Sequence, residues 1–190
     1  MDITGKLDAE VLEIIELLIS VCAASGIKPV LVGAIARDIH FLHVHDIPTD
    51  RAAVDVEFAV PMDSWDAFNA LMKEVIRDGS YILDTILGQR VHAPDGSMFD
   101  LLPFGGIEDP EGKISWPQDF NHVISTTGFQ DAFDAAQVCR VNADPPLEIR
   151  VASIPAVAVL KLIAWADGLP GCSEDAIDFR FILENYDAGN

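Results

Sequence analysis

The sequence predicts an α/β (α+β) protein in which helices flank a small mixed β-sheet and a helical region follows at the C-terminus. Apolar residues recur at helical spacing near the N-terminus, whereas β-branched segments with strand-like alternation occupy the middle of the chain. Pro155 and Ser173 stand where two further helices are expected to begin. We therefore expect residues 1–150 to form the sheet-containing domain and residues 151–190 to form a helical region packed on it.

The first 80 residues predict helices that alternate with strands. Gly26 is placed to end the first helix, and Gly33 lets a short buried strand turn tightly into the second helix. Ser64 is a favourable N-cap for the third helix. The expected elements are a helix over residues 8–25, a strand over 28–33, a helix over 34–43, a strand over 54–60 and a helix after Ser64.

The second half of the chain predicts a hairpin, a long loop, a strand and two helices. Asp95 and Gly96 form a typical hairpin turn. Residues 105–128 are rich in Gly, Pro and Asp, which favours an ordered loop with little regular structure. The expected elements are strands over residues 90–93 and 98–104, a strand over 147–154, a helix over 155–167, and a last helix that Ser173 caps and that runs through Tyr186.

The composition argues against membrane proteins, disulfide-rich proteins and non-specific nucleic-acid binders. Apolar runs are shorter than the roughly 18 residues that span a bilayer. The N-terminal residues show no signal or transit pattern, so we expect a cytoplasmic protein. The 3 cysteines lack CxxC spacing. A net charge of −19 repels polyanions, although a bound Mg²⁺ ion can bridge carboxylates to phosphates.

Asp55, Glu57 and Asp100 are the candidate metal ligands. Residues two apart on a strand face the same side, so Asp55 and Glu57 are expected to lie side by side. Asp100 completes the site if its strand lies beside theirs. Mg²⁺ prefers carboxylate oxygens, and one or two ions fit such a set. In a chain with 31 acidic residues, the same pattern also fits the solvent face of an ordinary strand.

The order of these features is more informative than any one of them. A strand, a glycine turn, a helix, an Asp-x-Glu strand and an acid on a later strand resemble the nucleotidyltransferase superfamily related to DNA polymerase β. Four segments carry a closer resemblance: LVGAIARD (31–38), RAAVDVEFAV (51–60), FDLLPFGG (99–106) and LKLIAW (160–165). With these segments, the chain is similar over about residues 10–187 to the AbiEii/AbiGii type of nucleotidyltransferase toxin.

That resemblance implies a nucleotidyltransferase-like domain that moves an NMP from an NTP to an acceptor and releases pyrophosphate. Asp55 and Glu57 would hold Mg²⁺ with the triphosphate, and Asp100 would bind a second ion or help to deprotonate the acceptor hydroxyl. An antitoxin is the implied protein partner. The acceptor stays open among RNA, protein and small molecules, with RNA less favoured by the surface charge. The expected nucleotide-binding residues are Gly33, Ala34, Arg37, Lys161 and Asp175.

Three residues depart from the family pattern. Ala34 replaces a small polar residue or glycine. Gly168 stands where an arginine often follows the helix that carries the lysine. Glu174 stands where a basic residue commonly precedes an Asp-x-x-Asp element. Each change removes a polar or positive group from the expected triphosphate site. The alternative is therefore a catalytically weakened protein of this fold that binds a nucleotide or a partner.

Other residues also allow two interpretations. Lys161 either contacts triphosphate or extends to the surface from an apolar helix. Asp175 and Asp178 match a family Asp-x-x-Asp element, or they form a solvated first helical turn. The histidines and aromatics are more typical of loop or packing roles than of a metal site or a base-stacking site. They are His40, His43, His45, Trp116 and Phe120.

Overall fold

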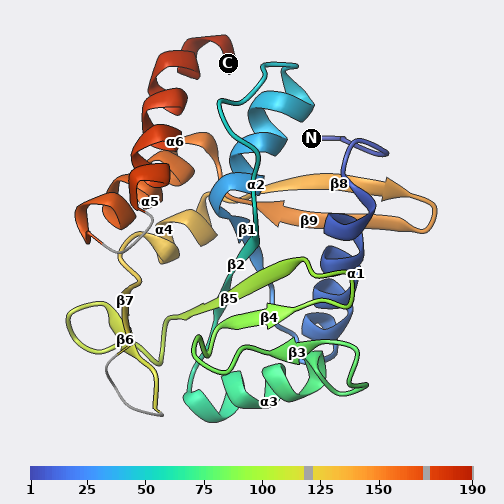
Figure 1. Ribbon diagram of the computed structural model, residues 1–190, viewed down its shortest axis with the longest axis vertical. Coiled ribbons are helices and arrows are strands. Elements are labelled where there is room, and N and C mark those ends of the chain that lie inside the picture. The colour runs from blue at the N-terminus through green and yellow to red at the C-terminus, as the bar shows by residue number, and fades with distance from the viewer. Residues whose placement is uncertain (118–121, 169–171, 190) are drawn as a thin grey trace.

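A mixed seven-stranded sheet forms the centre of the protein (Figure 1), whose computed structural model describes residues 1–117, 122–168 and 172–189. The strand order is β3-β4-β5-β2-β1-β9-β8. The pairs β1–β9 and β2–β5 are parallel, and the other pairs are antiparallel. The strands are β1 (Val30–Val32), β2 (Val56–Pro61), β3 (Ile82–Leu83), β4 (Arg90–His92), β5 (Met98–Phe104), β8 (Gln137–Ala143) and β9 (Pro146–Val151).

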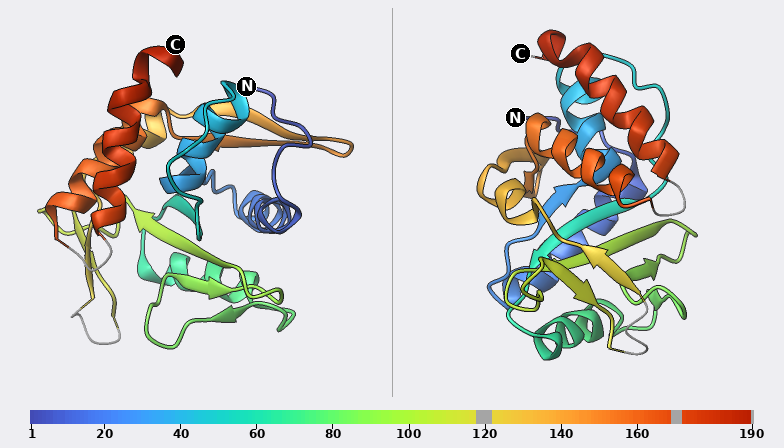
Figure 2. Two further views of the ribbon diagram at one scale, coloured as in Figure 1. Left: turned by 45° about the horizontal axis from the view of Figure 1, so that its top comes forward. Right: turned by 90° about the vertical axis from the view of Figure 1, so that its left-hand side faces the viewer.

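Helices cover the sheet and extend from one end of it. Contacts join α1 to α3, and α2 to both α5 and α6. Figures 1 and 2 show α5 and α6 side by side at one end of the molecule and α3 at the other. The helices are α1 (Ala9–Ala24), α2 (Gly33–Asp38), α3 (Trp65–Val75), α4 (Phe129–Asp134), α5 (Ile154–Ala166) and α6 (Cys172–Asn185). A π-helical segment, Ile39–Val44, continues α2, and a 3₁₀ turn, Tyr186–Gly189, follows α6.

The hydrophobic core lies between the central strands and the helices. Phe58 on β2 and Leu101 on β5 are fully buried, as are Ile15 and Leu18 on α1. Burying a side chain of this size stabilises the fold by about 1.5–3 kcal/mol. The central strands are therefore a rigid support for the polar residues at their ends. No helix in the described parts of the chain has the length and apolar character needed to span a bilayer.

The predicted fold class is confirmed, and most predicted elements are present. Ser64 caps α3 as expected, because its hydroxyl accepts a hydrogen bond from the Ala67 amide at 3.2 Å. Strand β2 starts at Val56 rather than Val54, so Asp55 directly precedes it. The strand expected over 147–154 ends at Val151, since Ile154 already belongs to α5. Helix α6 includes Ser173 instead of starting after it.

The prediction of little regular structure over residues 105–128 is wrong. Strands β6 (Lys113–Ser115) and β7 (Val123–Ser125) pair as a small antiparallel sheet. Ile114 is buried there, and Asp109 accepts backbone hydrogen bonds from Glu111 and Lys113 at 2.9 Å. Three-residue strands are too short for a periodic sequence signal. Helix α4 and strand β8 were not predicted either.

Candidate functional site

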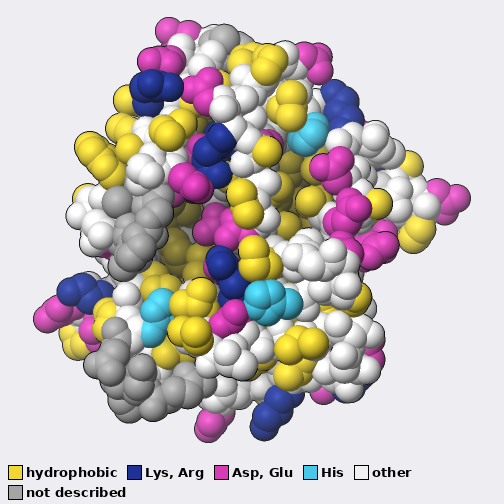
Figure 3. Space-filling model, viewed as in Figure 1, with side chains coloured by type: hydrophobic (Ala, Val, Ile, Leu, Met, Phe, Trp, Pro, Cys, Tyr) yellow, Lys and Arg dark blue, Asp and Glu magenta, His cyan; other side chains and the backbone are white. Residues whose placement is uncertain are grey.

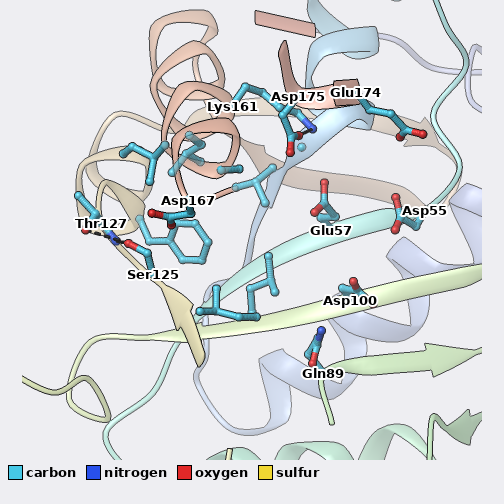
Figure 4. Close-up of a pocket in the computed structure, with 18 of the residues that line it drawn as sticks. Asp55, Glu57, Gln89, Asp100, Ser125, Thr127, Lys161, Asp167, Glu174 and Asp175 are labelled. Atoms are coloured by element: carbon cyan, nitrogen blue, oxygen red, sulfur yellow. Dashed lines mark hydrogen bonds and ion pairs between the residues drawn. The ribbon is translucent and has the colours of Figure 1, made fainter. Parts of the chain in front are cut away.

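Strand register brings three charged residues into one row across the sheet, and a fourth lies beside them. Glu57 on β2 pairs with Asp100 on β5, and Asp100 pairs in turn with Arg90 on β4. Directly paired residues on neighbouring strands face the same side of a sheet. Asp55 is two residues before Glu57 and shares that side. Figure 4 shows Asp55 and Glu57 near one end of β2, with Asp100 on the adjacent strand. The predicted grouping of the three acids is thus present in the structure.

Arg90 connects two of these carboxylates. Its Nη2 atom donates to Asp55 Oδ2 and to Asp100 Oδ2, each at 2.8 Å, and its Nε atom donates to Asp100 Oδ1 at 2.8 Å. The guanidinium therefore makes a bidentate contact with Asp100 and a single contact with Asp55. The hydrogen bonds to Asp100, together with its charge, raise the pKa of Arg90 further above its usual value. Sequence reasoning did not single out Arg90.

Gly33 leaves the space that the Glu57 carboxylate fills. The residue has φ +66°, and a Cβ atom placed there would lie 1.7 Å from Glu57 Oε2. Only glycine satisfies both requirements without strain. The turn from β1 into α2 therefore positions Glu57. Of the expected nucleotide-binding residues, Gly33 lines a cavity of about 370 Å³ at this face of the sheet, whereas Ala34, also a described residue, is buried and does not line it.

Burial and mutual repulsion favour the protonated forms of two of the acids. Burial is the main cause that raises the pKa of Glu57 to about 7, and Asp55 and Asp100 add to the increase against the opposing charge of Lys161. Burial also raises the pKa of Asp55, as does the charge of Asp100, while Arg90 opposes both. Within the described residues, the Glu57 carboxylate has no hydrogen bond or ion pair. The site therefore has negative charge that its own cations only partly neutralise.

Lys161 is a buried ammonium at the opposite wall of the cavity. Its side chain is 9% exposed, and Nζ lies 2.7 Å from Asp175 Oδ1 and 3.3 Å from Asp178 Oδ2. Burial disfavours the charge, but the carboxylates of Glu57 and Asp175 outweigh burial and raise the pKa of Lys161. Figure 4 shows its side chain directed toward Asp175. The interpretation in which the Lys161 side chain extends to solvent is therefore wrong.

Asp178 is the centre of a buried ion-pair network. It is fully buried and pairs with Arg37, with Arg51 at 2.9 Å, and with Lys161. Arg37 also pairs with Asp38 at 2.6 Å and does not line the cavity that the described residues form. Arg37 thus holds α2 against α6 in this structure. The interpretation of Asp175 and Asp178 as a solvated first helical turn is therefore wrong for the buried Asp178. It does not fit Asp175 either, because Asp175 lines the cavity.

The cavity has a volume of about 370 Å³ and lies between the sheet, the β6–β7 hairpin, α5 and the start of α6. Figure 3 shows acidic and basic side chains around a hollow in this face of the molecule. Its other end is more apolar and is lined by Leu102, Ile124, Phe129, Leu160 and Ile163. The hydroxyls of Ser125 and Thr127 also line it. Sequence reasoning missed this apolar end because the hairpin that supplies part of it was not predicted.

His40 and Trp116 are buried in the described part of the protein and do not line the cavity. His40 is buried, and its Nε2 atom hydrogen-bonds the Ala152 carbonyl at 2.8 Å. Burial lowers the pKa of both His40 and His43. Trp116 is buried against Trp65, with ring centroids 5.4 Å apart. Phe120 lies outside the described residues. Packing is therefore the role that the structure supports for Trp116.

The chemistry of the three carboxylates fits a hard divalent cation, but their present arrangement does not complete a metal site. Mg²⁺ prefers oxygen ligands, and Asp55, Glu57 and Asp100 supply them on one face of the sheet. In the described portion of the chain, however, no three His, Cys, Asp or Glu side chains are placed to hold one ion. Arg90 accounts for this, because Asp55 and Asp100 are directed toward its guanidinium.

Comparisons with known proteins show the fold. No protein-family model and no curated protein matches the sequence. The crystal structure of ANT(2″)-Ia in complex with adenylyl-2″-tobramycin aligns with a TM-score of 0.56 and 12% identity, over 94% of this chain and 90% of that chain. The solution structure of the antibiotic-resistance factor ANT(2″)-Ia aligns with a TM-score of 0.57 and 14% identity, over 96% and 89%.

A third similar structure is an antigenic nucleotidyltransferase-like protein from Paracoccidioides brasiliensis. It aligns with a TM-score of 0.53 and 12% identity, over 94% of this chain and 78% of that chain. At such identities the similarity extends to the fold alone. The specific resemblance to AbiEii/AbiGii-type toxins stays a prediction, whereas the nucleotidyltransferase fold that the sequence predicted is the fold of this protein.

Proposed function

We propose that this protein is a metal-dependent nucleotidyltransferase that moves an NMP from an NTP to an acceptor hydroxyl. The observation that carries the proposal is the shared cavity. Asp55, Glu57 and Asp100 line one wall of it and Lys161 lines another, in a chain with the fold of nucleotidyltransferases. Carboxylates with a nearby buried ammonium suit a nucleotide that arrives with a divalent cation, because such a ligand carries charges of both signs.

In the proposed reaction, the acceptor hydroxyl oxygen bonds to the α-phosphorus while the bond from that phosphorus to the β-phosphate oxygen breaks. Pyrophosphate leaves, and Asp100 takes the hydroxyl proton. Asp55, Glu57 and Asp100 would hold Mg²⁺, which would neutralise phosphate charge. Lys161 faces the triphosphate and keeps its charge because of Asp175 and Asp178. Gly33 keeps the Glu57 carboxylate close to the turn.

We further propose a hydroxylated small molecule, neutral or cationic, as the acceptor. The cavity contains further acids at Asp167, Glu174 and Asp175, and the chain has a net charge of −19. Such charge disfavours a polyanionic RNA and favours cations. The apolar end of the cavity offers contact area for a small molecule. One structure of similar fold, ANT(2″)-Ia, was solved with adenylyl-2″-tobramycin, in which a small molecule carries the transferred group.

The resemblance to AbiEii/AbiGii-type toxins extends the proposal to a growth-inhibiting enzyme that is controlled by an antitoxin. Induced expression of the wild-type chain should then arrest growth, whereas Asp55→Asn should not. Equal growth with both proteins, at matched protein levels, would remove the toxin role and leave the transfer activity to be judged by its own assay.

The transfer assay uses each α-³²P-labelled NTP with Mg²⁺ and separate pools of small molecules, proteins and RNA from cell extract. We expect label in one pool, and its loss with EDTA or with Asp55→Asn. Asp66→Asn is the matched control, because Asp66 is an exposed acid on α3, away from the cavity. Unlabelled pools for all four NTPs would contradict the proposal, as would labelling that Asp55→Asn leaves unchanged.

A second candidate is a protein of the same fold that binds a nucleotide without transferring it. The ion pairs of Arg90 with Asp55 and Asp100 favour this candidate, because they engage two of the three proposed metal ligands. Calorimetry with each NTP separates the two. Saturable NTP binding together with no labelled product supports the binding protein, and labelled product excludes it.

A further inference from the structure

Arg90 differs from the other cations of the cavity in the partners that hold it. Lys161 pairs with Asp175 and Asp178, and Arg51 pairs with Asp178 at 2.9 Å and with Glu174 at 3.1 Å. All of these acids belong to α6, so metal binding at the sheet leaves their ion pairs intact. Arg90, in contrast, pairs with Asp55 and Asp100, which are both proposed metal ligands.

The same carboxylate oxygens cannot serve Arg90 and a metal ion at full strength. Arg90 donates to Asp55 Oδ2 and to both oxygens of Asp100 at 2.8 Å. Mg²⁺ needs its ligand oxygens at about 2.0–2.1 Å in near-octahedral geometry. A guanidinium in hydrogen-bond contact with these oxygens places a positive charge where the ion would bind. The ion must therefore disrupt these hydrogen bonds and displace the guanidinium.

A displaced guanidinium would have a suitable anion nearby when the nucleotide is present. Arg90 is partly exposed, with 22% of its side chain accessible, and it lines the cavity. Guanidinium groups bind phosphate oxygens through two parallel hydrogen bonds. The metal ion would then neutralise the three carboxylates, and Arg90 would pair with a phosphate group. Each carboxylate, the guanidinium and the phosphate would therefore face an opposite charge.

We infer that Arg90 is a built-in cation that keeps metal affinity low in the nucleotide-free protein and moves to a phosphate group when metal and NTP bind together. This inference rests on the proposed function. It deepens that function by making Arg90 the residue that couples the two ligands. Metal and nucleotide therefore bind with positive cooperativity, and each raises the affinity for the other by the same factor.

Calorimetric titration of Mg²⁺ into the nucleotide-free protein tests the inference. We expect Arg90→Gln to bind Mg²⁺ about tenfold or more tightly than the wild type, because a positive charge next to the ion is removed. Arg90→Lys keeps the charge and should stay close to the wild type. Arg77→Gln is the control for a lost surface charge, since Arg77 is exposed and pairs with Glu74. Circular dichroism checks that each variant is folded.

The same titration in the presence of a non-hydrolysable NTP analogue tests the coupling. The analogue should raise the Mg²⁺ affinity of the wild type by a larger factor than that of Arg90→Gln. Equal or weaker Mg²⁺ affinity of Arg90→Gln without nucleotide would overturn the inference, because Arg90 would then only support the carboxylates. Equal coupling factors would also overturn it, as would a failure of both proteins to bind Mg²⁺.

These outcomes are independent of the transfer assay. Tighter metal binding by Arg90→Gln with no labelled product in any pool would sustain the role of Arg90 and refute nucleotidyl transfer. Labelled product with unchanged metal affinity would do the reverse.

Discussion

Replacement of Asp178 by alanine should destabilise the protein more than any change at an exposed acid of the same helix. Asp178 is fully buried and pairs with Arg37, Arg51 and Lys161. In the variant, Arg51 keeps Glu174 and Lys161 keeps Asp175 as partners. Arg37 is 1% exposed and keeps only Asp38 and the Arg51 carbonyl. The main cost is therefore a buried guanidinium that has lost one of two carboxylates.

Removing one partner of a buried ion pair costs about 3–5 kcal/mol. In a domain of this size, each kcal/mol corresponds to roughly 2–4 °C in Tm. We therefore expect Tm of Asp178→Ala to fall by about 6–20 °C. Asp178→Asn should lose less, because the amide oxygen still accepts a hydrogen bond from Arg37.

Urea unfolding followed by circular dichroism measures the change in the free energy of unfolding. Glu184→Ala is the control, because Glu184 lies on the same helix and its side chain is 62% exposed. That substitution should stay within about 0.5 kcal/mol of the wild type. A loss below about 1 kcal/mol for Asp178→Ala would refute the network as the element that holds α6 on α2.

Three further predictions concern the cavity. Gly33→Ala should lower both stability and metal affinity, because its Cβ would lie 1.7 Å from Glu57 Oε2. Gly26→Ala controls for backbone strain, since its φ is +70° with nothing within 4 Å, and equal effects in urea unfolding would contradict the clash. The metal-free wild type should lose stability relative to Glu57→Gln as pH rises from about 4.5 to about 7. Burial raises the pKa of Glu57 from 4.5 to about 7, so within this range the folded state keeps the proton that the unfolded state releases. The loss amounts to at most about 3 kcal/mol, and a difference between the two proteins that is constant across this range would show that the carboxyl is not perturbed. Lys161→Met should weaken NTP binding by roughly tenfold in calorimetry, as expected for a lost charged contact, whereas the exposed Lys113→Met should leave it unchanged.

The sequence allowed prediction of the strands that carry the site, because each has a strong local signal. Asp55 and Glu57 are two residues apart on a β-branched strand, and Asp100 follows a hairpin turn at Asp95 and Gly96. Alternation along a strand defines which side chains share a face. It does not define which strands are neighbours, so the register of Glu57 with Asp100 came only from the structure.

Arg90 was missed although a local signal for it existed. The predicted hairpin around Asp95 and Gly96 places Arg90 near Asp100, and the observed register pairs these two residues. Counting the pairs outward from the turn would have exposed an arginine beside a proposed metal ligand.

The role of Arg37, unlike that of Arg90, had no local signal in the sequence. On α2 it follows the glycine turn, where a basic residue would suit a triphosphate. Its burial depends on α6, which supplies Asp178 from 141 residues further along the chain. Ion pairs between distant segments leave no periodic pattern, so a local argument could not distinguish a ligand-binding arginine from one that joins two helices. The apolar end of the cavity is hidden for a similar reason, because it depends on the short strands β6 and β7.

The proposed function requires Asp55, Glu57 and Asp100 together to hold a divalent cation beside an NTP. Crystals grown with Mn²⁺ and a non-hydrolysable NTP analogue test it by anomalous diffraction. We expect a manganese peak between these three carboxylates, with the triphosphate beside Lys161 and with Arg90 no longer bridging Asp55 and Asp100. Bound nucleotide without a peak at that position, and with Arg90 still in its present ion pairs, would contradict it.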